Sequence, residues 1–378
     1  LLLSLAPSPF LPYPLLPYPS SPMSVRRVVT LVLLLGLFAA AAWIARGRLA
    51  PGGDPAVAAR TKPAPAIKPR SAAEIIPKLQ GPPKRTGVTV KDLLAGKVPK
   101  LNQLEIEAFL KDQGRSATNL LAASRLLRDL KYAREAAAAY PKDPAVQLEI
   151  ALRGETPEEK AAALAAFREA APGNSLGDYL AARQAFAGGD GAAAAAALAR
   201  SLDNPVLEDY TQRMLGGSEQ AYLAAGYEPV AAAGAAMFSL TLDHVQPLQQ
   251  VSDQLKAMQD EFIRSADFDA AEPTVIIGLT LGQRIQDQGP YLIDQIVGIN
   301  IEKKFLQQLD PLTAAGPGGQ SAGERSDDLD ARLLEIKTLA AGFTEKFAEA
   351  DESTQSRYLA KMKAEGELAA MRWLMEQK

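Results

Sequence analysis

The 378-residue chain contains no cysteine and a single histidine, His244. The lack of cysteine excludes disulfides, cysteine-ligated zinc, iron–sulfur clusters and thiol nucleophiles. It also excludes a lipoprotein signal. One histidine excludes metal sites built from several imidazoles and leaves one residue for any serine–histidine chemistry. The sequence therefore predicts no catalytic, cofactor or metal site, and we expect a protein that is not an enzyme.

Charge is distributed unevenly, although the formal net charge is only −3. The first 100 residues carry 14 Lys and Arg against 3 Asp and Glu, whereas the remainder carries 27 against 41. Hydrophobic residues make up 47% and charged residues 22%, which are ordinary values for a globular protein. The length allows two or three domains, and we expect a basic N-terminal region followed by an acidic globular part.

Residues 1–22 contain seven prolines and no charge, a composition that cannot hold a helix. Met23 is followed by Ser, Val and two arginines, which is typical of a natural amino terminus. We interpret residues 1–22 as a start-site artefact. The alternative is a proline-rich apolar extension of unknown use.

An uncharged run from Val28 to Ala45 lies between paired arginines on both sides. It has the length of a spanning helix and exceeds the usual apolar part of a cleaved signal. Trp43 is placed for the membrane interface. Residues 23–45 are therefore predicted to be a retained transmembrane anchor, with cleavage after Ala42 as the alternative. The short basic tail before the run favours an extracytoplasmic location for the rest of the chain.

Residues 46–100 hold nine prolines and twelve Lys and Arg. Such a segment buries too little apolar surface to offset chain entropy, so we interpret it as an extended basic linker. Its residues 88–96 are suited to a helical turn or a short docking piece. Nucleic-acid binding is not expected, because aromatic residues for base stacking are missing.

The pattern of residues 101–378 is all-α. Asn102 followed by Glu105 forms a capping-box-like start, and Gly114 is placed to end that helix. Ser116 begins a run expected to be helical to Leu130, and Thr156 is a further start signal. No strand-like alternation is evident.

Proline-containing junctions recur 31 and 33 residues apart, at Tyr140–Pro144, Ala171–Asn174 and Asp203–Pro205. Small and apolar residues repeat at a spacing of 31 between them: Ala151 with Ala182, Ala163 with Ala194, and Phe167 with Leu198. This arrangement resembles the tetratricopeptide repeat over residues 130–210, which implies stacked helix pairs and a concave groove for a protein or peptide partner. An irregular alanine-rich helical domain is the alternative. We expect repeats over residues 101–226.

Residues 227–378 are expected to form longer helical hairpins. One apolar stripe runs from Leu248 to Phe262, and others cover residues 329–347 and 359–373. The last two stripes are predicted to form an antiparallel hairpin, with Gly366 and Ala369 leaving room for Phe343 or Phe347. Residues 311–328 are predicted to be a flexible loop.

Four groups of residues are candidates for chemistry, and each has a structural alternative. The glycines between Gly318 and Gly323 have phosphate-loop spacing, but Glu324 replaces the required lysine. His244 next to Asp243 suggests an acid–base pair, although a cap or surface histidine is favoured. Acids at Asp267, Asp269 and Glu272 fit a helix start better than a calcium loop. Tyr210, Tyr222, Tyr227 and Phe238 fit either a peptide groove or ordinary core packing.

Two functions from different classes remain at this point. The first is a membrane-tethered, non-catalytic helical-repeat scaffold for a partner protein in a bacterial-type cell envelope. The second is an envelope-associated helical enzyme or chaperone-like factor with a pocket. A deep cavity with converging ionisable groups favours the second, and an open curved groove favours the first. The sequence leaves the oligomeric state open.

Overall fold

The computed structural model describes residue 85 and residues 87–377, which belong to one compact unit. These residues form α-helices and no strand, so the predicted all-α class is confirmed for them. None of their helices is both long and apolar enough to cross a membrane. The expected anchor Val28–Ala45 and residues 1–22 lie outside the described residues.

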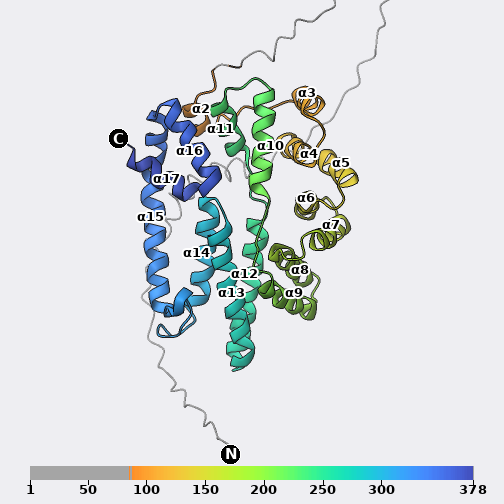
Figure 1. Cartoon of the computed structure of the whole chain (residues 1–378). Helices are drawn as coiled ribbons and strands as arrows, with labels where there is room; N and C mark the ends of the chain where they lie inside the picture. The colour runs from red at the N-terminus through yellow and green to blue at the C-terminus, as the bar shows by residue number, and fades with distance from the viewer. Residues whose placement is uncertain (1–84, 86, 378) are drawn as a thin grey trace, which may run out of the picture. The chain divides into compact units, whose positions relative to one another are not determined.

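Figure 1 shows the course of the chain from α2 to α17. The helices are α2 (Val90–Leu94), α3 (Gln103–Gln113), α4 (Ala117–Leu127), α5 (Leu130–Ala139), α6 (Pro144–Arg153), α7 (Pro157–Ala170), α8 (Ser175–Ala187), α9 (Gly191–Asp203), α10 (Thr211–Ala224), α11 (Pro229–Ser239), α12 (Val245–Arg264), α13 (Phe268–Gln288), α14 (Leu292–Leu306), the 3₁₀ turn η2 (Pro317–Gly319), α15 (Ala322–Glu349), α16 (Glu352–Glu365) and α17 (Glu367–Glu376).

Capping side chains set several helix starts where the sequence predicts them. The amide of Glu105 donates to Asn102 Oδ1 at 3.1 Å, and the amide of Asn102 donates to Glu105 Oε2 at 2.7 Å. Ser116 and Thr156 cap α4 and α7 through their hydroxyl oxygens. These contacts pair amides that the first helical turn leaves free. Gly114 ends α3 with a φ of 84°, which glycine adopts without strain.

Helices α4 to α9 form a series of helical hairpins. Helix α4 pairs with α5, α6 with α7, and α8 with α9. Helix α6 starts at Pro144 and α8 at Ser175, which preserves the spacing of 31. Ala163 and Ala194 occupy equivalent positions in α7 and α9 and are both buried. The small-residue register therefore coincides with close helix packing, and the described region has the character of a helical solenoid.

Later helices of the same chain pack on the first helices of these hairpins. Helix α10 contacts α4 and α12 contacts α8, and Figure 1 shows α10 and α12 beside the series α3–α9. The Arg213 guanidinium of α10 donates to both Asp143 carboxylate oxygens, at 2.9 and 2.6 Å, where α6 begins. It also donates to Thr118 Oγ1 of α4 at 2.8 Å. The chain thus covers part of its own repeat surface.

The C-terminal helices differ from the expected hairpin. Gly366 adopts a φ of 89° and separates α16 from α17, so the predicted continuous helix 359–373 is two helices. Helix α17 packs on both α15 and α16. Phe343 and Phe347 pack on the Tyr358 ring, at centroid distances of 5.2 and 4.8 Å, rather than against Gly366. The prediction that Gly366 leaves room for Phe343 or Phe347 was therefore wrong, because Gly366 lies at the end of α16.

Two further boundaries need correction. The predicted flexible loop 311–328 is largely ordered as η2 and the start of α15, where Ser321 and Glu324 form a capping box. Helix α4 stops at Leu127 instead of Leu130 because Arg128 turns into the left-handed region with a φ of 56°.

Packing in the described residues crosses both expected domain limits, at residues 100 and 226. Helix α2 lies against α11 and α15 and buries Leu93, so the packed region begins before Leu101 and the docking-piece prediction is confirmed. One hydrophobic cluster includes Ile106 and Leu374, and the other includes Leu148 and Ile336. Each core therefore draws on both sides of residue 226.

Candidate functional site

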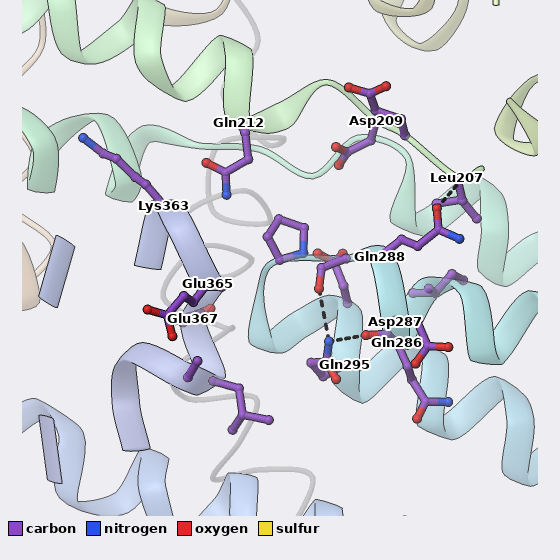
Figure 2. A pocket seen from close by; sticks show the side chains of 18 of the residues that line it. Leu207, Asp209, Gln212, Gln286, Asp287, Gln288, Gln295, Lys363, Glu365 and Glu367 are labelled. Carbon is purple, nitrogen blue, oxygen red and sulfur yellow. Dashed lines mark hydrogen bonds between the residues drawn. The ribbon is translucent and has the colours of Figure 1, made fainter. Parts of the chain in front are cut away.

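A cleft of about 570 Å³ lies between the segment before α10, the α13–α14 connection and α15–α17. Figure 2 shows Asp209 and Gln212 on one side of it and Glu365 and Glu367 on the other. The acidic, basic and histidine side chains that line it are Glu208, Asp209, His244, Asp287, Asp294, Arg332, Lys363, Glu365, Glu367 and Arg372. Acidic and basic side chains from several elements therefore meet at this one cavity.

His244 lies buried on the cleft lining, between two carboxylates. Its Nδ1 is 3.0 Å from Asp209 Oδ2, and its Nε2 is 3.4 Å from Asp294 Oδ1. The second distance is longer than an ordinary N–H···O hydrogen bond, so this contact is mainly ionic. Burial alone lowers the pKa of His244, but the interactions with Asp294 and Asp209 outweigh it and the pKa is raised. The site therefore favours the imidazolium form.

Local backbone structure fixes both carboxylates. Asp209 precedes α10 and accepts hydrogen bonds from the Thr211 amide at 2.9 Å and the Thr211 hydroxyl at 2.5 Å. Asp294 lies in the first turn of α14, and its Oδ2 accepts from the Tyr291 amide at 3.2 Å. His244 itself occupies the N-cap position of α12 without capping through its side chain. Three helix starts thus converge on one imidazole.

The charge network continues into the repeat through Arg125 of α4. Its Nη2 is 2.7 Å from Glu149 Oε2 and 3.6 Å from Asp243 Oδ2. Glu149 is fully buried and also pairs with Arg153 at 2.6 Å. Asp243 therefore pairs with Arg125, and the carboxylates that contact His244 are others. The favoured alternative for His244 was a cap or surface histidine. It does occupy the N-cap position of α12, but its exposed fraction is 4%, so it does not lie on the surface.

The opposite wall of the cleft holds a carboxylate and a guanidinium. Glu367 Oε2 accepts from the Leu292 amide at 2.8 Å, and burial together with the charge of Asp294 raises the pKa of Glu367. The Arg332 guanidinium donates to the Gln295 side-chain oxygen and has no carboxylate partner among the described residues. Burial lowers the pKa of Arg332, and Asp287 offsets part of that effect.

The geometry at His244 is suited to holding charge. A histidine that acts as a general base needs one nitrogen directed at the substrate. Here a carboxylate lies beside each nitrogen, so the imidazole links α10, α12 and α14 electrostatically. Within residues 87–377, no three His, Asp or Glu side chains are grouped so that they could hold a metal ion.

The other sequence candidates have structural roles where the structure places them. Glu324 caps α15 with Ser321, so the glycine segment before it leads into a helix. Asp267 caps α13, and Asp269 lies in its first turn, as expected for helix-start acids. Tyr222 and Tyr227 are buried in a core cluster with their rings 5.6 Å apart. Tyr210 and Phe238 are half-buried at the edge of that cluster.

Sequence reasoning missed Asp209, Asp294, Glu367 and Arg332. Asp209 and Asp294 each lie near a helix start, which is also where acids are common for local reasons. Their position around His244 depends on how α10, α12 and α14 meet. The sequence gives no sign that these three helices meet, apart from the fact that His244 is the only histidine.

Comparison with known proteins gives no family: no family model, no curated protein and no solved structure matches this chain.

Proposed function

We propose that this chain is a membrane-tethered, non-catalytic helical scaffold that binds a partner protein in a bacterial-type cell envelope. The tether is Val28–Ala45, and the helical domain lies on the extracytoplasmic side. The hairpins α4–α9 act as a tetratricopeptide-type repeat, supported by the spacing of 31 between α6 and α8. Nucleic acid is not the expected partner.

One observation carries the proposal: the buried ionic network around His244 joins the repeat to the later helices. His244 contacts carboxylates before α10 and in α14. Arg125 of α4 pairs with Glu149 of α6 and also lies 3.6 Å from Asp243, the residue before His244. We infer that these paired charges fix the relative position of the elements that carry them, because separating the partners would leave a buried charge uncompensated. A fixed arrangement of the repeat and the later helices suits a scaffold, which must present its binding surface in one geometry.

Helices α10 and α12 pack on α4 and α8 and so cover part of the repeat surface. A partner therefore gains access at the surfaces of the repeat that these two helices leave open. Membrane tethering would concentrate such a partner near the anchor without requiring tight binding at the domain itself.

The experiment is expression of the chain from Met23, followed by membrane fractionation and carbonate extraction. We expect the protein to stay with the membrane, and a matched chain lacking residues 28–45 to be soluble. Crosslinking before detergent solubilisation should yield a discrete complex with another protein. Recovery of a soluble protein whose amino terminus is Trp43 would show that the segment is a removed signal.

A second candidate is an envelope enzyme or chaperone-like factor that uses the cleft as its pocket. The convergence of Glu367, Arg332 and His244 on that cleft favours it. Thermal shifts with a panel of small anions and zwitterions test this alternative. A stabilisation that Arg332→Gln abolishes would support a ligand pocket, whereas no response would leave the scaffold as the better proposal.

A further inference from the structure

The tip of the α12–α13 hairpin exposes large apolar side chains. Phe268 is 66% exposed, Ile276 46% and Ile263 37%. None of these three side chains belongs to either hydrophobic cluster of the described residues. Figure 1 shows this end of α12 and α13 extending past α9 and α14. Apolar groups of this size gathered at one end of a hairpin are typical of an interaction surface.

The tip is a continuation of a packed helix. The α12 stripe is buried at Leu248, Val251 and Leu255, but at Phe262 it is only half-buried. The C-terminal end of α12 therefore extends beyond the neighbouring elements that cover its first part. A defined turn closes the hairpin, since the Asp267 amide donates to the Phe262 carbonyl at 2.8 Å. Ala266 supplies the left-handed residue of that turn, with a φ of 58°.

The same tip is acidic. Residues 260–276 contain five Asp and Glu and one arginine, Arg264. Arg264 is already paired with Glu261 at 2.6 Å. Asp269 and Glu272 have no ion-pair partner among the described residues. The surface thus combines exposed apolar side chains with carboxylates that are free to meet a cation.

Spacing arranges these groups along one helix. Phe268, Glu272 and Ile276 follow one another at intervals of four residues on α13, so they share a face. Such a stripe matches the apolar face of a second helix, whose side chains can pack between Phe268 and Ile276.

We propose that this tip is the docking surface for a basic amphipathic helix of a partner protein. The partner's apolar residues contact Phe268 and Ile276, and its Lys or Arg residues contact Asp269 and Glu272. The inference rests on the proposed scaffold function, because it names the chemistry of the partner. A second copy of the chain would bring two acidic tips together, and an anionic membrane surface would repel this one.

Binding can be followed at the tip itself because the chain contains no cysteine. Ser265→Cys, in the exposed turn, accepts an environment-sensitive dye, and the full chain is reconstituted in nanodiscs of zwitterionic lipid. The probe is an 18-residue Leu/Lys amphipathic peptide, and its Leu/Glu counterpart is the control. We expect a saturable change in emission with the Leu/Lys peptide that weakens as salt is raised, and none with the Leu/Glu peptide.

Paired variants separate the apolar and ionic parts. Phe268→Ser should weaken binding at least tenfold, and Asp269→Asn with Glu272→Gln several-fold with loss of most of the salt dependence. Leu334→Ser is the matched control, since Leu334 is 64% exposed on α15 and should leave binding unchanged. Circular dichroism confirms that each variant is folded.

Three results would overturn the proposal: equal binding of the Leu/Glu peptide, no effect of Phe268→Ser, or self-association that Phe268→Ser abolishes in sedimentation. The last would assign the tip to a second copy. Failure of the scaffold proposal is separate, because loss of membrane attachment would appear in carbonate extraction while the tip still bound the peptide.

Discussion

Gly298 of α14 faces Gly282 of α13 so closely that a Cβ on Gly298 would lie 2.6 Å from the Gly282 carbonyl oxygen. A Cβ on Gly282 would in turn lie 2.6 Å from the Glu302 amide nitrogen. Both obstacles are backbone atoms, which cannot rotate away as a side chain can. The backbones of the two helices are therefore in direct contact. This contact positions α14, whose first turn holds Asp294 beside His244.

Gly298→Ala should destabilise the fold by about 1–3 kcal/mol or more, because the added methyl group must push α13 and α14 apart. Gly216→Ala is the matched control: Gly216 lies in α10, and a Cβ there meets nothing within 4 Å. Replacing that glycine should stabilise the helix by up to ~1 kcal/mol. Urea unfolding of the Gly52–Lys378 unit measures both changes. If Gly298→Ala lowers the free energy of unfolding by less than a typical overpacking substitution in the core does, the backbone-contact interpretation is contradicted.

Glu149→Gln should be strongly destabilising. Glu149 is fully buried between Arg125 and Arg153, so its neutralisation leaves Arg125 buried with only the more distant Asp243. Breaking a buried pair in this way typically costs about 3–5 kcal/mol. Glu335→Gln is the control, because the pair between Arg372 and Glu335 is half exposed and should be worth no more than ~1 kcal/mol. Equal losses for the two variants would show that the network around Glu149 is not a structural joint.

The helix ends and the repeat could be predicted because both depend on local chemistry. Asn102, Ser116 and Thr156 contact amides within three residues of themselves. The spacing of 31 is likewise visible in the order of residues, since equivalent helices of a repeat reuse the same packing positions. The capping contacts and the repeat spacing therefore do not depend on how distant parts of the chain pack.

The junction around His244 depends on elements distant in sequence, and periodicity cannot show which helices meet. The neighbouring Asp243 was the natural partner to suggest, yet it contacts Arg125. The α12 stripe illustrates the same limit, because its pattern runs evenly from Leu248 to Phe262. Its burial ends earlier, since Leu255 is buried whereas Phe262 is only half-buried. A pattern predicts which face of a helix is apolar without predicting how far that face is covered.

Stability should fall as pH rises through the titration of His244. The pKa of this histidine is raised in the folded chain, so the folded state holds its proton to higher pH than the unfolded state does. Its contribution is fully present below the unfolded pKa, about 6.5, and is lost as pH rises through the folded pKa. Urea unfolding between about pH 5.5 and 8.5 measures the slope.

His244→Gln should remove that part of the slope, and the assignment is clean because the chain has one histidine. Burial and nearby acids also raise the pKa of Glu208 and Glu367, which gives a slope of the same sign that begins at lower pH. The difference between the native chain and the variant isolates the histidine. An unchanged slope in His244→Gln would show that the carboxylates account for all of it.

The repeat register predicts unequal effects of the same substitution at different alanines. Ala163 and Ala194 are 6% and 0% exposed, and Leu at either position adds three heavy atoms to a closely packed crossing. Overpacking of this kind typically costs ~1–3 kcal/mol. Ala192 is exposed on the same helix as Ala194, and Ala192→Leu should change stability by no more than about 0.5 kcal/mol. Thermal unfolding of the three variants makes the comparison. Because alanine is abundant throughout α7 and α9, composition alone predicts that the three variants shift the unfolding midpoint equally. Equal shifts would show that the 31-residue spacing is a coincidence of that abundance.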